Sequence, residues 1–470
     1  MKKLLSVALA AAMLLSIAGC SDENAASGQT ADANTSATSG AVTDGTGTST
    51  TDTPSADAAE KTLSRPVAVT ENGDVDMTVA MQYETDFDAL IASLNERAVD
   101  PTKPVSQNLN EDGQAVFDYL RGIYGKQVLS CQQMMNIDCM EDIVYYNATG
   151  DMPAMKGFDF IFSTGPYPDH HMIDEAIKWH EESGGLVTFT WHWNVPRDIN
   201  DENMGIAFYQ KEIINFDPLN ATTPGTKEYE VAVHDIDAIA IQLQRLESAG
   251  VTVLFRPLHE ASGAWFWWGV QNKQFVQNET YQRLWYMIYD RLENYHGLTN
   301  LIWVWNGQSE FCYVHPNTYD IAGIDYYANS ENHTACESQY NSLSNYNDKN
   351  HTKYLGEDYK LPAEPYGGKM LAMSECGYIP DPADCVNTGC MWLYYMIWNG
   401  DFVYKASASG TAITSLDGTP SPNEERMTNE MLVEYFGNEA MITYKDLPAQ
   451  FTEGKGFPQR IATWEYFRME

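Results

Sequence analysis

Basic residues are scarce in this 470-residue chain, in which 28 Lys and Arg stand against 65 Asp and Glu. The resulting formal net charge of −37 repels nucleic acid and anionic membrane surfaces, so neither is expected as a partner. A neutral ligand is indifferent to such a field. We therefore interpret the acidic surplus as a feature that keeps the protein soluble, not as a binding determinant.

Long apolar runs are equally rare, because after residue 20 no stretch approaches about 18 consecutive apolar residues. The one run at the start, "MKKLLSVALAAAMLLSIAGC", has two lysines, an apolar centre and small residues before Cys20, which predicts a signal peptide over residues 1–19. Its last four residues resemble the lipobox of bacterial lipoproteins. The resemblance implies that Cys20 is lipidated and that the protein attaches to the outer face of the cell envelope through lipid only. The alternative is an ordinary signal peptide with a chance cysteine.

Cysteines are few, eight in all, and none of their spacings matches a zinc ribbon. Seven follow Cys20, and an odd number in an exported chain leaves at least one free thiol. The short spacings Cys131/Cys139 and Cys385/Cys390 are compatible with disulfides or with no bond at all. We interpret these cysteines as structural.

Aromatic residues are absent from residues 20–63, which are rich in Ser, Thr, Ala and Gly. Such a composition cannot bury enough surface to offset chain entropy, so we expect a flexible linker there. Residues 64–104 mix strand-like and helix-like patterns, and we interpret them as an N-terminal extension packed on the main domain. The main domain is expected over residues 105–470.

From about residue 110 the chain alternates helix-like stretches with short apolar runs. The predicted strands are 127–131, 153–160, 185–191, 251–256, 300–305, 320–326, 369–374 and 392–398, and the clearest predicted helices are 170–182, 233–249 and 279–296. Eight continuous apolar strands between amphipathic helices favour parallel strands buried on both faces, as in a (β/α)8 TIM barrel. A doubly wound open sheet is the alternative, weakened by the lack of a Gly-rich phosphate loop after the first strand.

Two glutamates, Glu260 and Glu375, directly follow apolar runs at the ends of the fourth and seventh predicted strands. These strand ends meet at the mouth of a barrel. Glycoside hydrolysis with retention needs two carboxyl groups about 5–5.5 Å apart, one as acid/base and one as nucleophile. The alternative for either glutamate is a structural ion pair with a barrel arginine such as Arg256.

Aromatic side chains cluster near the same strand ends: Trp191, Trp193, Trp265, Phe266, Trp267, Trp268, Trp305 and Trp398. Their flat faces suit stacking on sugar rings, although each could equally belong to the core. Four consecutive aromatics in "AWFWWG" cannot all point into one interior. At least one or two are therefore expected to line a groove.

At this point a resemblance becomes specific. "LFRPLHEASGAWFWWG" is similar to the fourth-strand signature of glycoside hydrolase family 26, and the similarity continues through "GFDF", "TFTWHW", "NLIWVWNG", "GIDYYA", "MSECGY" and "AMITYKDLP", over roughly residues 105–450. The family consists of secreted retaining enzymes with a (β/α)8 barrel, most of them endo-β-1,4-mannanases. The expected partner is therefore a β-mannan-type polysaccharide or oligosaccharide, bound by a monomer.

Carried onto matching positions, the resemblance implies Glu260 as acid/base and Glu375 as nucleophile. It further implies substrate-site residues His192, His259, Trp265, Asp325, Tyr327 and Trp398, with Tyr327 holding the carboxylate of Glu375. No metal and no cofactor is expected. One departure concerns the eighth strand, because some family members follow its tryptophan with an arginine that helps set specificity, whereas Asn399 and Gly400 follow Trp398 here.

Two alternatives to a mannanase stay open at the level of sequence. The same chemistry could act on another β-glycan, either mixed-linkage β-glucan or β-1,3-xylan. A different class, a lipid-anchored protein that binds glycans without cleaving them, would share the linker, the lipobox and the aromatic groove. Such a binder has no use for both Glu260 and Glu375, so loss of activity on changing either residue separates the two classes.

Overall fold

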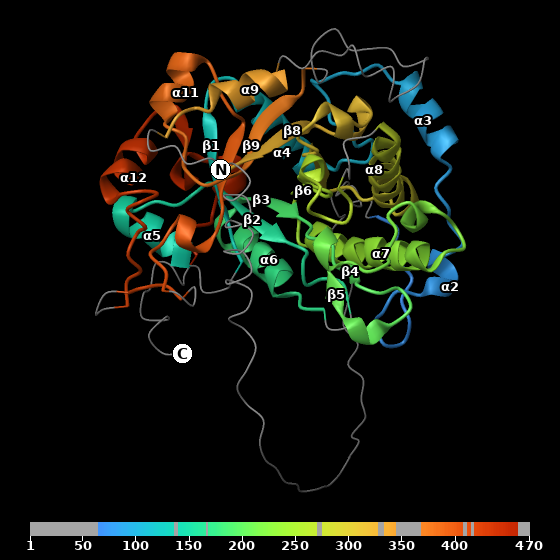
Figure 1. Ribbon diagram of the computed structural model, residues 1–470. Coiled ribbons are helices and arrows are strands. Elements are labelled where there is room, and N and C mark those ends of the chain that lie inside the picture. Colours follow the sequence, from blue (N-terminus) through green and yellow to red (C-terminus); the bar gives the residue numbers. More distant parts are fainter. Residues whose placement is uncertain are drawn as a thin grey trace, which may run out of the picture. The chain divides into compact units, whose positions relative to one another are not determined.

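Eight parallel strands close into a barrel in the computed structural model, which describes residues 64–135, 140–165, 168–269, 275–327, 333–344, 368–407, 411–414 and 418–458. The strands are β1 (Val128–Gln133), β2 (Met155–Asp159), β3 (Leu186–Thr190), β6 (Val253–Arg256), β7 (Leu301–Trp305), β8 (Ile321–Tyr326), β9 (Met370–Cys376) and β10 (Tyr394–Ile397). Each pairs with the next, and β10 returns to β1 with Tyr394 opposite Leu129. This closure confirms the predicted (β/α)8 TIM barrel over an open sheet, and the labelled barrel strands gather at the centre of Figure 1.

All eight predicted strands are present because their apolar runs are buried on both faces. Every residue of β1, β2, β3, β6, β7, β9 and β10 is buried. Inside the barrel, glycines make room for larger neighbours. A Cβ at Gly157 would collide with Gln133 and Met396, and one at Gly323 would collide with Ser374. Gly157 and Gly323 therefore let these longer side chains fill the interior.

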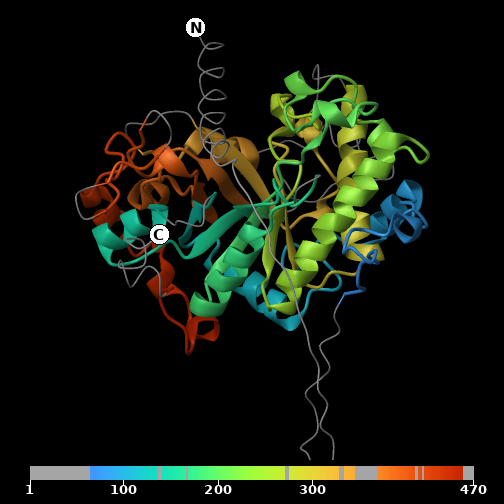
Figure 2. The same cartoon turned by 90° about the horizontal axis from the view of Figure 1, so that it is seen from below.

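Helices surround the barrel on its outside. They are α4 (Glu111–Ile123), α5 (Met140–Thr149), α6 (His171–Ser183), α7 (Lys227–Ser248), α8 (Phe275–Tyr289), α9 (Glu337–Ser344), α11 (Pro382–Thr388), α12 (Asn429–Phe436) and α13 (Ala449–Thr452). The long green helix in Figure 2 is α7. It begins six residues before the predicted 233–249, where the hydroxyl of Thr226 caps the N–H of Tyr229 at 3.2 Å. The predicted helix 279–296 is α8 followed by a π-helix, η6 (Asp290–Tyr295).

Shorter elements complete the described chain. A small strand, β11 (Met441–Ile442), pairs with β1 outside the barrel, and β4 (Val195–Pro196) pairs with β5 (Ile206–Ala207) as a separate hairpin. The 3₁₀ turns are η2 (Glu202–Met204), η3 (Gln210–Glu212), η4 (Asn220–Thr222), η5 (Ala261–Gly263), η7 (Glu310–Cys312), η8 (Pro316–Thr318), η11 (Gly400–Phe402) and η12 (Tyr444–Asp446). Within the described ranges, no helix combines the length and the apolar character needed to cross a membrane.

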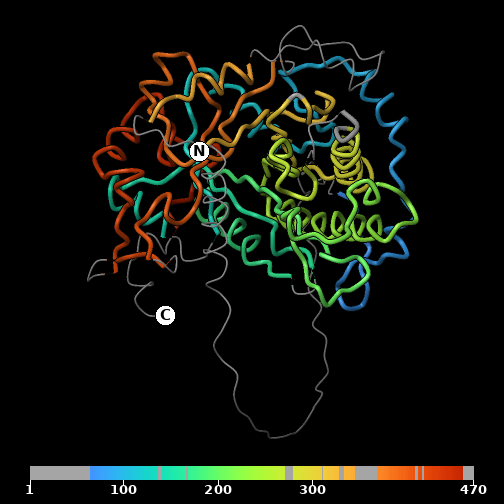
Figure 3. The backbone as a smooth tube through the Cα atoms, in the orientation of Figure 1, coloured from blue at the N-terminus to red at the C-terminus, as the bar shows by residue number. Residues whose placement is uncertain are grey.

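The segment from Ser64 to residue 104 lies along the outside of α7 and α8, as the blue trace in Figure 3. It contains α2 (Met77–Ala80) and α3 (Phe87–Glu96). The buried guanidinium of Arg291 donates to the carbonyls of Ala80 and Tyr83 at 3.3 and 3.1 Å, and the hydroxyl of Tyr83 donates to Asp290 at 2.7 Å. The extension therefore contributes buried partners to the helical layer.

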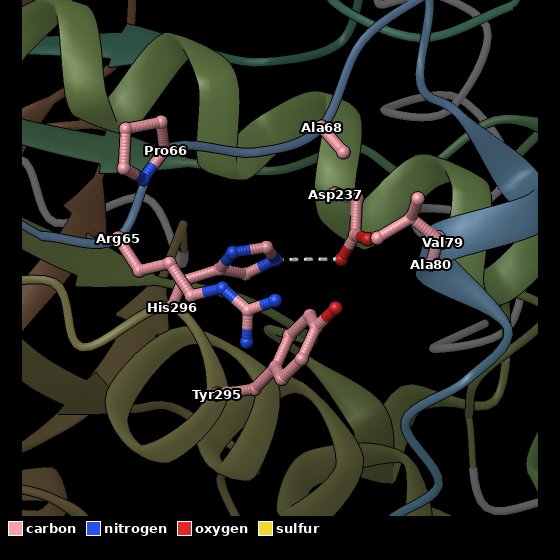
Figure 4. Close-up of a pocket in the computed structure, with 8 residues that line it drawn as sticks. All are labelled: Arg65, Pro66, Ala68, Val79, Ala80, Asp237, Tyr295 and His296. Carbon is pink, nitrogen blue, oxygen red and sulfur yellow. Dashed lines mark hydrogen bonds and ion pairs between the residues drawn. The ribbon is translucent and has the colours of Figure 1, made fainter.

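A small pocket lies between this extension and the helices, lined by Arg65, Pro66, Ala68, Val79, Ala80, Asp237, Tyr295 and His296 (Figure 4). One of the lining residues, Asp237, binds Arg291 at 2.7 Å and His296 at 2.9 Å. The lining residues come from the extension, α7 and the end of η6. The pocket is thus separate from the residues that follow the barrel strands.

None of the six described cysteines, Cys131, Cys312, Cys336, Cys376, Cys385 and Cys390, forms a disulfide. The Cys385/Cys390 spacing therefore carries no bond. Cys20, the predicted signal peptide, the linker and Cys139 lie outside the described residues.

Candidate active site

Three carboxylates meet where β6, β8 and β9 end. Glu260 follows β6, Asp325 lies near the end of β8, and Glu375 lies near the end of β9. One oxygen from each lies within 4.8 Å of an oxygen from each of the others. For Glu260 and Glu375 such a close approach of two oxygens agrees with the retaining spacing of about 5–5.5 Å between carboxyl groups.

The turn that carries Glu260 has an unusual backbone. Leu258 and Glu260 both adopt the left-handed conformation, with φ of 52° and 53°. Each such residue costs about 1–3 kcal/mol and persists only where its surroundings fix it. Here the N–H of Glu260 donates to the carbonyl of Asn306 at 2.8 Å, and the indole of Trp268 donates to the carbonyl of His259 at 2.9 Å. The strained turn therefore costs folding free energy, and these two hydrogen bonds hold it in the conformation that orients the carboxyl group of Glu260.

Glu260 is only partly buried and holds a proton readily. Loss of solvation raises its pKa well above the ordinary value, and the negative charges of Asp325 and Glu375 raise it further. The indole N–H of Trp265 donates to Oε2 of Glu260 at 2.8 Å and opposes this shift. A carboxyl group with a raised pKa at an accessible rim suits a proton donor.

Glu375 is buried and accepts a hydrogen bond on each oxygen. Arg256 donates to Oε1, and the hydroxyl of Tyr327 donates to Oε2 at 2.6 Å. Two such donors suit an ionised, precisely oriented carboxylate. The ion pair with Arg256, which the sequence offers as an alternative to catalysis, thus exists at Glu375. An oxygen of Glu375 still lies within 4.8 Å of an oxygen of Glu260, so the ion pair and the catalytic role are compatible.

Asp325 completes the cluster from the opposite side of Arg256, which it contacts at 3.0 Å. It also accepts from Asn306 at 2.6 Å and from Ser374 at 2.8 Å. Burial and the charge of Glu375 raise its pKa, whereas Arg256, Ser374 and Asn306 oppose the rise. Three carboxylates could in principle hold a cation. The guanidinium of Arg256 already bridges Asp325 and Glu375, so the cluster has its own positive charge.

The two predicted histidines lie together and face away from solvent. His192 follows β3 and is 5% exposed, and His259 precedes Glu260 and is 1% exposed. Their Nε2 atoms are 3.2 Å apart. Asp159, at the end of β2, lies 2.5 Å from Nδ1 of His192. Asp159 lies in the motif "GFDF" but is not predicted as a site residue, since nothing local to β2 indicates that its carboxylate reaches β3.

The aromatic residues are mostly core. Trp265 is 42% exposed, whereas the other seven are at most 7% exposed: Trp191, Trp193, Phe266, Trp267, Trp268, Trp305 and Trp398. The expectation that "AWFWWG" sends one or two rings to the surface holds for Trp265. The alternative stated for each ring, that it belongs to the core, holds for the fully buried members, because they pack on one another. Trp191 and Trp193, for example, are stacked with ring centroids 4.2 Å apart.

An insertion between β3 and α7 covers these tryptophans and forms one wall of the site. Within it, the N–H of Gln210 donates to the carbonyl of Trp265 at 2.8 Å, and the carbonyl of Phe208 accepts from Trp267 at 3.1 Å. The ring of Phe208 lies 5.1 Å from that of His192 and is partly exposed. Sequence reasoning does not find Phe208, because the insertion has no barrel periodicity.

An arginine also lies near the end of β10, although Asn399 and Gly400 follow Trp398. The guanidinium of Arg426 packs on the rings of Tyr378 and Phe402, 4.8 Å from each centroid. The ring of Phe402 lies 5.4 Å from that of Tyr327. Arg426 comes from a segment far along the chain, so motif spacing could not indicate it.

Comparison with known proteins gives consistent matches. The sequence pattern described as "Glycosyl hydrolase family 26" matches residues 105–415. Mannan endo-1,4-beta-mannosidase B from Piromyces sp is 33% identical over 344 residues, covering 71% of this chain and 52% of the relative. Mannan endo-1,4-beta-mannosidase from Thermothelomyces thermophilus is 34% identical over 326 residues, covering 67% and 61%. The chain thus spans about half to three fifths of the length of these relatives.

Solved structures agree with these sequence matches. The Podospora anserina GH26-CBM35 beta-(1,4)-mannanase superposes with a TM-score of 0.57 at 29% identity, covering 75% of this chain and 70% of the other. A ruminal GH26 endo-beta-1,4-mannanase gives 0.58 at 27% identity, covering 74% and 71%. The closed barrel, the paired glutamates at its strand ends and the match over residues 105–415 lead to one conclusion: the chain belongs to glycosyl hydrolase family 26.

Proposed function

We propose that the protein is a retaining endo-β-1,4-mannanase that hydrolyses internal bonds of mannan, glucomannan or galactomannan by double displacement. The observation that carries the proposal is the pair Glu260 and Glu375, whose oxygens lie within 4.8 Å and whose surroundings differ. Glu260 has a raised pKa, whereas Glu375 accepts hydrogen bonds from Arg256 and Tyr327. The choice of mannan is supported by the names of the relatives that share the family.

In the first step, protonated Glu260 donates its proton to the departing glycosidic oxygen while Glu375 attacks the anomeric carbon. Arg256 and Tyr327 hold the attacking carboxylate in position. The proton moves from Glu260 to the leaving sugar, and a covalent bond forms between Glu375 and the retained sugar. Charge disappears from Glu375 as this bond forms.

The loss of that charge prepares the second step. Because the negative charge of Glu375 is one cause of the raised pKa of Glu260, the pKa of Glu260 falls when Glu375 becomes an ester. Glu260, now a carboxylate, takes a proton from water, and the resulting hydroxide displaces Glu375 from the sugar. Two inversions at one carbon leave the product in its original β configuration.

The remaining site residues are proposed to bind and orient sugar. Trp265 offers an exposed ring face next to Glu260, and Trp398 lies 6.0 Å from the ring of His192. His192, His259 and Asp325 line the same cluster. Trp265, the most exposed aromatic here, is the preferred candidate for stacking on a pyranose ring.

Sugar release from a panel of polysaccharides tests the proposal. We expect activity on mannan, glucomannan and galactomannan, and Glu260→Ala and Glu375→Ala should each lose about three orders of magnitude or more in rate. Activity confined to lichenan or β-1,3-xylan would be compatible with retaining hydrolysis but would reject mannan as the substrate. Binding without turnover would instead indicate a glycan-binding protein. Proton NMR of the first-formed anomer tests retention separately.

We also propose that the protein is a lipoprotein anchored through Cys20 on the outer face of a bacterial envelope. The support is the sequence "IAGC" after an apolar run. Metabolic labelling with a fatty-acid analogue should label the parent and not Cys20→Ser, and only the parent should sediment with membranes. Equal labelling of both proteins would contradict the anchor.

A further inference from the structure

A row of hydrogen bonds beside the two glutamates has no part in the two-carboxylate scheme. Oδ2 of Asp159 lies 2.5 Å from Nδ1 of His192, and Nε2 of His192 lies 3.2 Å from Nε2 of His259. Nδ1 of His259 lies 3.3 Å from the hydroxyl of Thr190. The row therefore runs from the end of β2, across β3, to the residue that precedes Glu260.

The partners determine which atoms carry protons. Oδ1 of Asp159 accepts the N–H of Ile161 at 2.9 Å and the N–H of His192 at 3.1 Å, which leaves Oδ2 as the acceptor for a hydrogen on Nδ1 of His192. The hydroxyl of Thr190 donates to the carbonyl of Arg256 at 3.3 Å, so it accepts from Nδ1 of His259. A neutral His259 with hydrogen on Nδ1 has only an acceptor at Nε2. His192 must then donate from Nε2 as well, which makes it an imidazolium.

The charges around His192 agree with this assignment. Burial alone lowers its pKa, but the charge and hydrogen bond of Asp159 outweigh burial, and Glu375 adds to them, so the net direction is upward. Burial and the charges of His192 and Arg256 lower the pKa of His259 instead. The charge of Arg256 opposes the rise in the pKa of His192 without reversing it. The other rings around His192, those of Phe208, Phe266 and Trp398, are uncharged.

The row ends at a strained part of the backbone. His259 lies between Leu258 and Glu260, both of which have positive φ. Its ring is fixed by Thr190 and His192. A fixed ring at this position removes a rotation about the turn that would otherwise move the carboxyl group of Glu260.

We propose that Asp159 is a positioning residue: it keeps His192 doubly protonated, His192 holds the ring of His259, and His259 holds the turn that aims Glu260. The effect on turnover rests on the proposed function, in which Glu260 is the acid/base. The protonation of His192 itself does not depend on any substrate. Asp159 acts through its neighbours and is not itself a reacting group.

The variant Asp159→Asn keeps the shape of the side chain and removes its charge. We expect kcat to fall about tenfold or more with KM little changed, since neutralising an aspartate that fixes a histidine is costly in other hydrolases. The alkaline limb of the pH–rate profile reflects loss of a proton from Glu260 or from His192, and it should move to lower pH because His192 loses its anionic partner and deprotonates first. Asp159→Glu, which restores the charge, should recover part of the alkaline limb.

A matched control exists on the outside of the barrel. Asp237 is likewise buried and likewise binds a histidine, His296, at 2.9 Å (Figure 4). Asp237→Asn should lower stability without moving the pH–rate profile. An equal displacement of the profile in both variants would assign the effect of Asp159 to general destabilisation and overturn the proposal.

Nitrogen-detected NMR of the unmodified protein gives a second readout that needs neither substrate nor a folded variant. At pH 7, His192 should carry hydrogen on both ring nitrogens and His259 only on Nδ1. A singly protonated His192 would overturn the proposal. If the parent protein cleaves no β-mannan, the proposed function is wrong. The NMR measurement would still show which ring nitrogens of His192 and His259 carry hydrogen.

Discussion

Glu375→Gln provides a direct measurement of how the two glutamates share one site. Their carboxyl oxygens lie within 4.8 Å, and the charge of Glu375 is one of the causes that raise the pKa of Glu260. Two unit charges about 5 Å apart interact by about 3 kcal/mol at an effective dielectric constant near 20. This corresponds to about two pKa units. Glu375→Gln should therefore lower the pKa of Glu260 by about two units, and burial and Asp325 should keep it above the ordinary value.

The assay is an NMR titration of protein labelled with ¹³C in the glutamate side-chain carboxyl groups. Glu293 offers an internal reference, because burial raises its pKa to about 7 and its partners, Trp303 and Ser106, lie outside the three-carboxylate cluster. The Glu293 midpoint should stay in place while that of Glu260 moves. A Glu260 midpoint that moves by less than about half a unit would refute the coupling and, with it, the proton cycling proposed for the second step.

Three further predictions address other parts of the molecule. Because folding raises the pKa of Glu293 from 4.5 to about 7, the free energy of unfolding should fall by about 3 kcal/mol as pH rises through this range. In Glu293→Gln, the free energy of unfolding measured by urea titration should change less with pH in this range. Parallel pH dependences of parent and variant would contradict the prediction. Trp265→Phe removes the indole donor that lowers the pKa of Glu260, so the alkaline limb of the parent activity should move to higher pH, and an unmoved limb would argue against that role. Ala264 has a positive φ of 59°, a conformation that glycine adopts without strain. Ala264→Gly should therefore raise the melting temperature by an amount equivalent to about 1 kcal/mol. A lower melting temperature would mean that the greater entropy of the unfolded chain outweighs the relief of strain.

The barrel could be predicted because its signals are local. Each strand is a continuous apolar run, and the runs are separated by helix-length segments. Glu260 and Glu375 stand out because a charge directly after such a run has few structural uses. The ion pair and the hydrogen bond that hold Glu375 follow from the fold, since Arg256 and Tyr327 reach it only when β6, β8 and β9 lie in one sheet.

What could not be predicted depends on contacts between distant segments. The direction of the rings in "AWFWWG" is set by the left-handed residues before them and by the insertion that covers Trp267. Asp159 and His192 belong to different strands, and Arg426 reaches the site from beyond the barrel repeat. A pattern of apolar and polar residues carries no information on these pairings.

The first described residues, from Ser64 on, are held by several hydrogen bonds whose arrangement bears on mechanical load. Ser64 bonds to Glu247, the N–H of Arg65 donates to the carbonyl of His296 at 2.8 Å, and the side chain of Gln244 bonds to both Arg65 and Val67. These bonds join one short stretch to the last turns of α7 and η6. A pull on the chain ahead of Ser64 would therefore act on these bonds before it acts on the rest of the extension. The bonds at Ser64 thus stand between such a pull and the strands that carry Glu260 and Glu375.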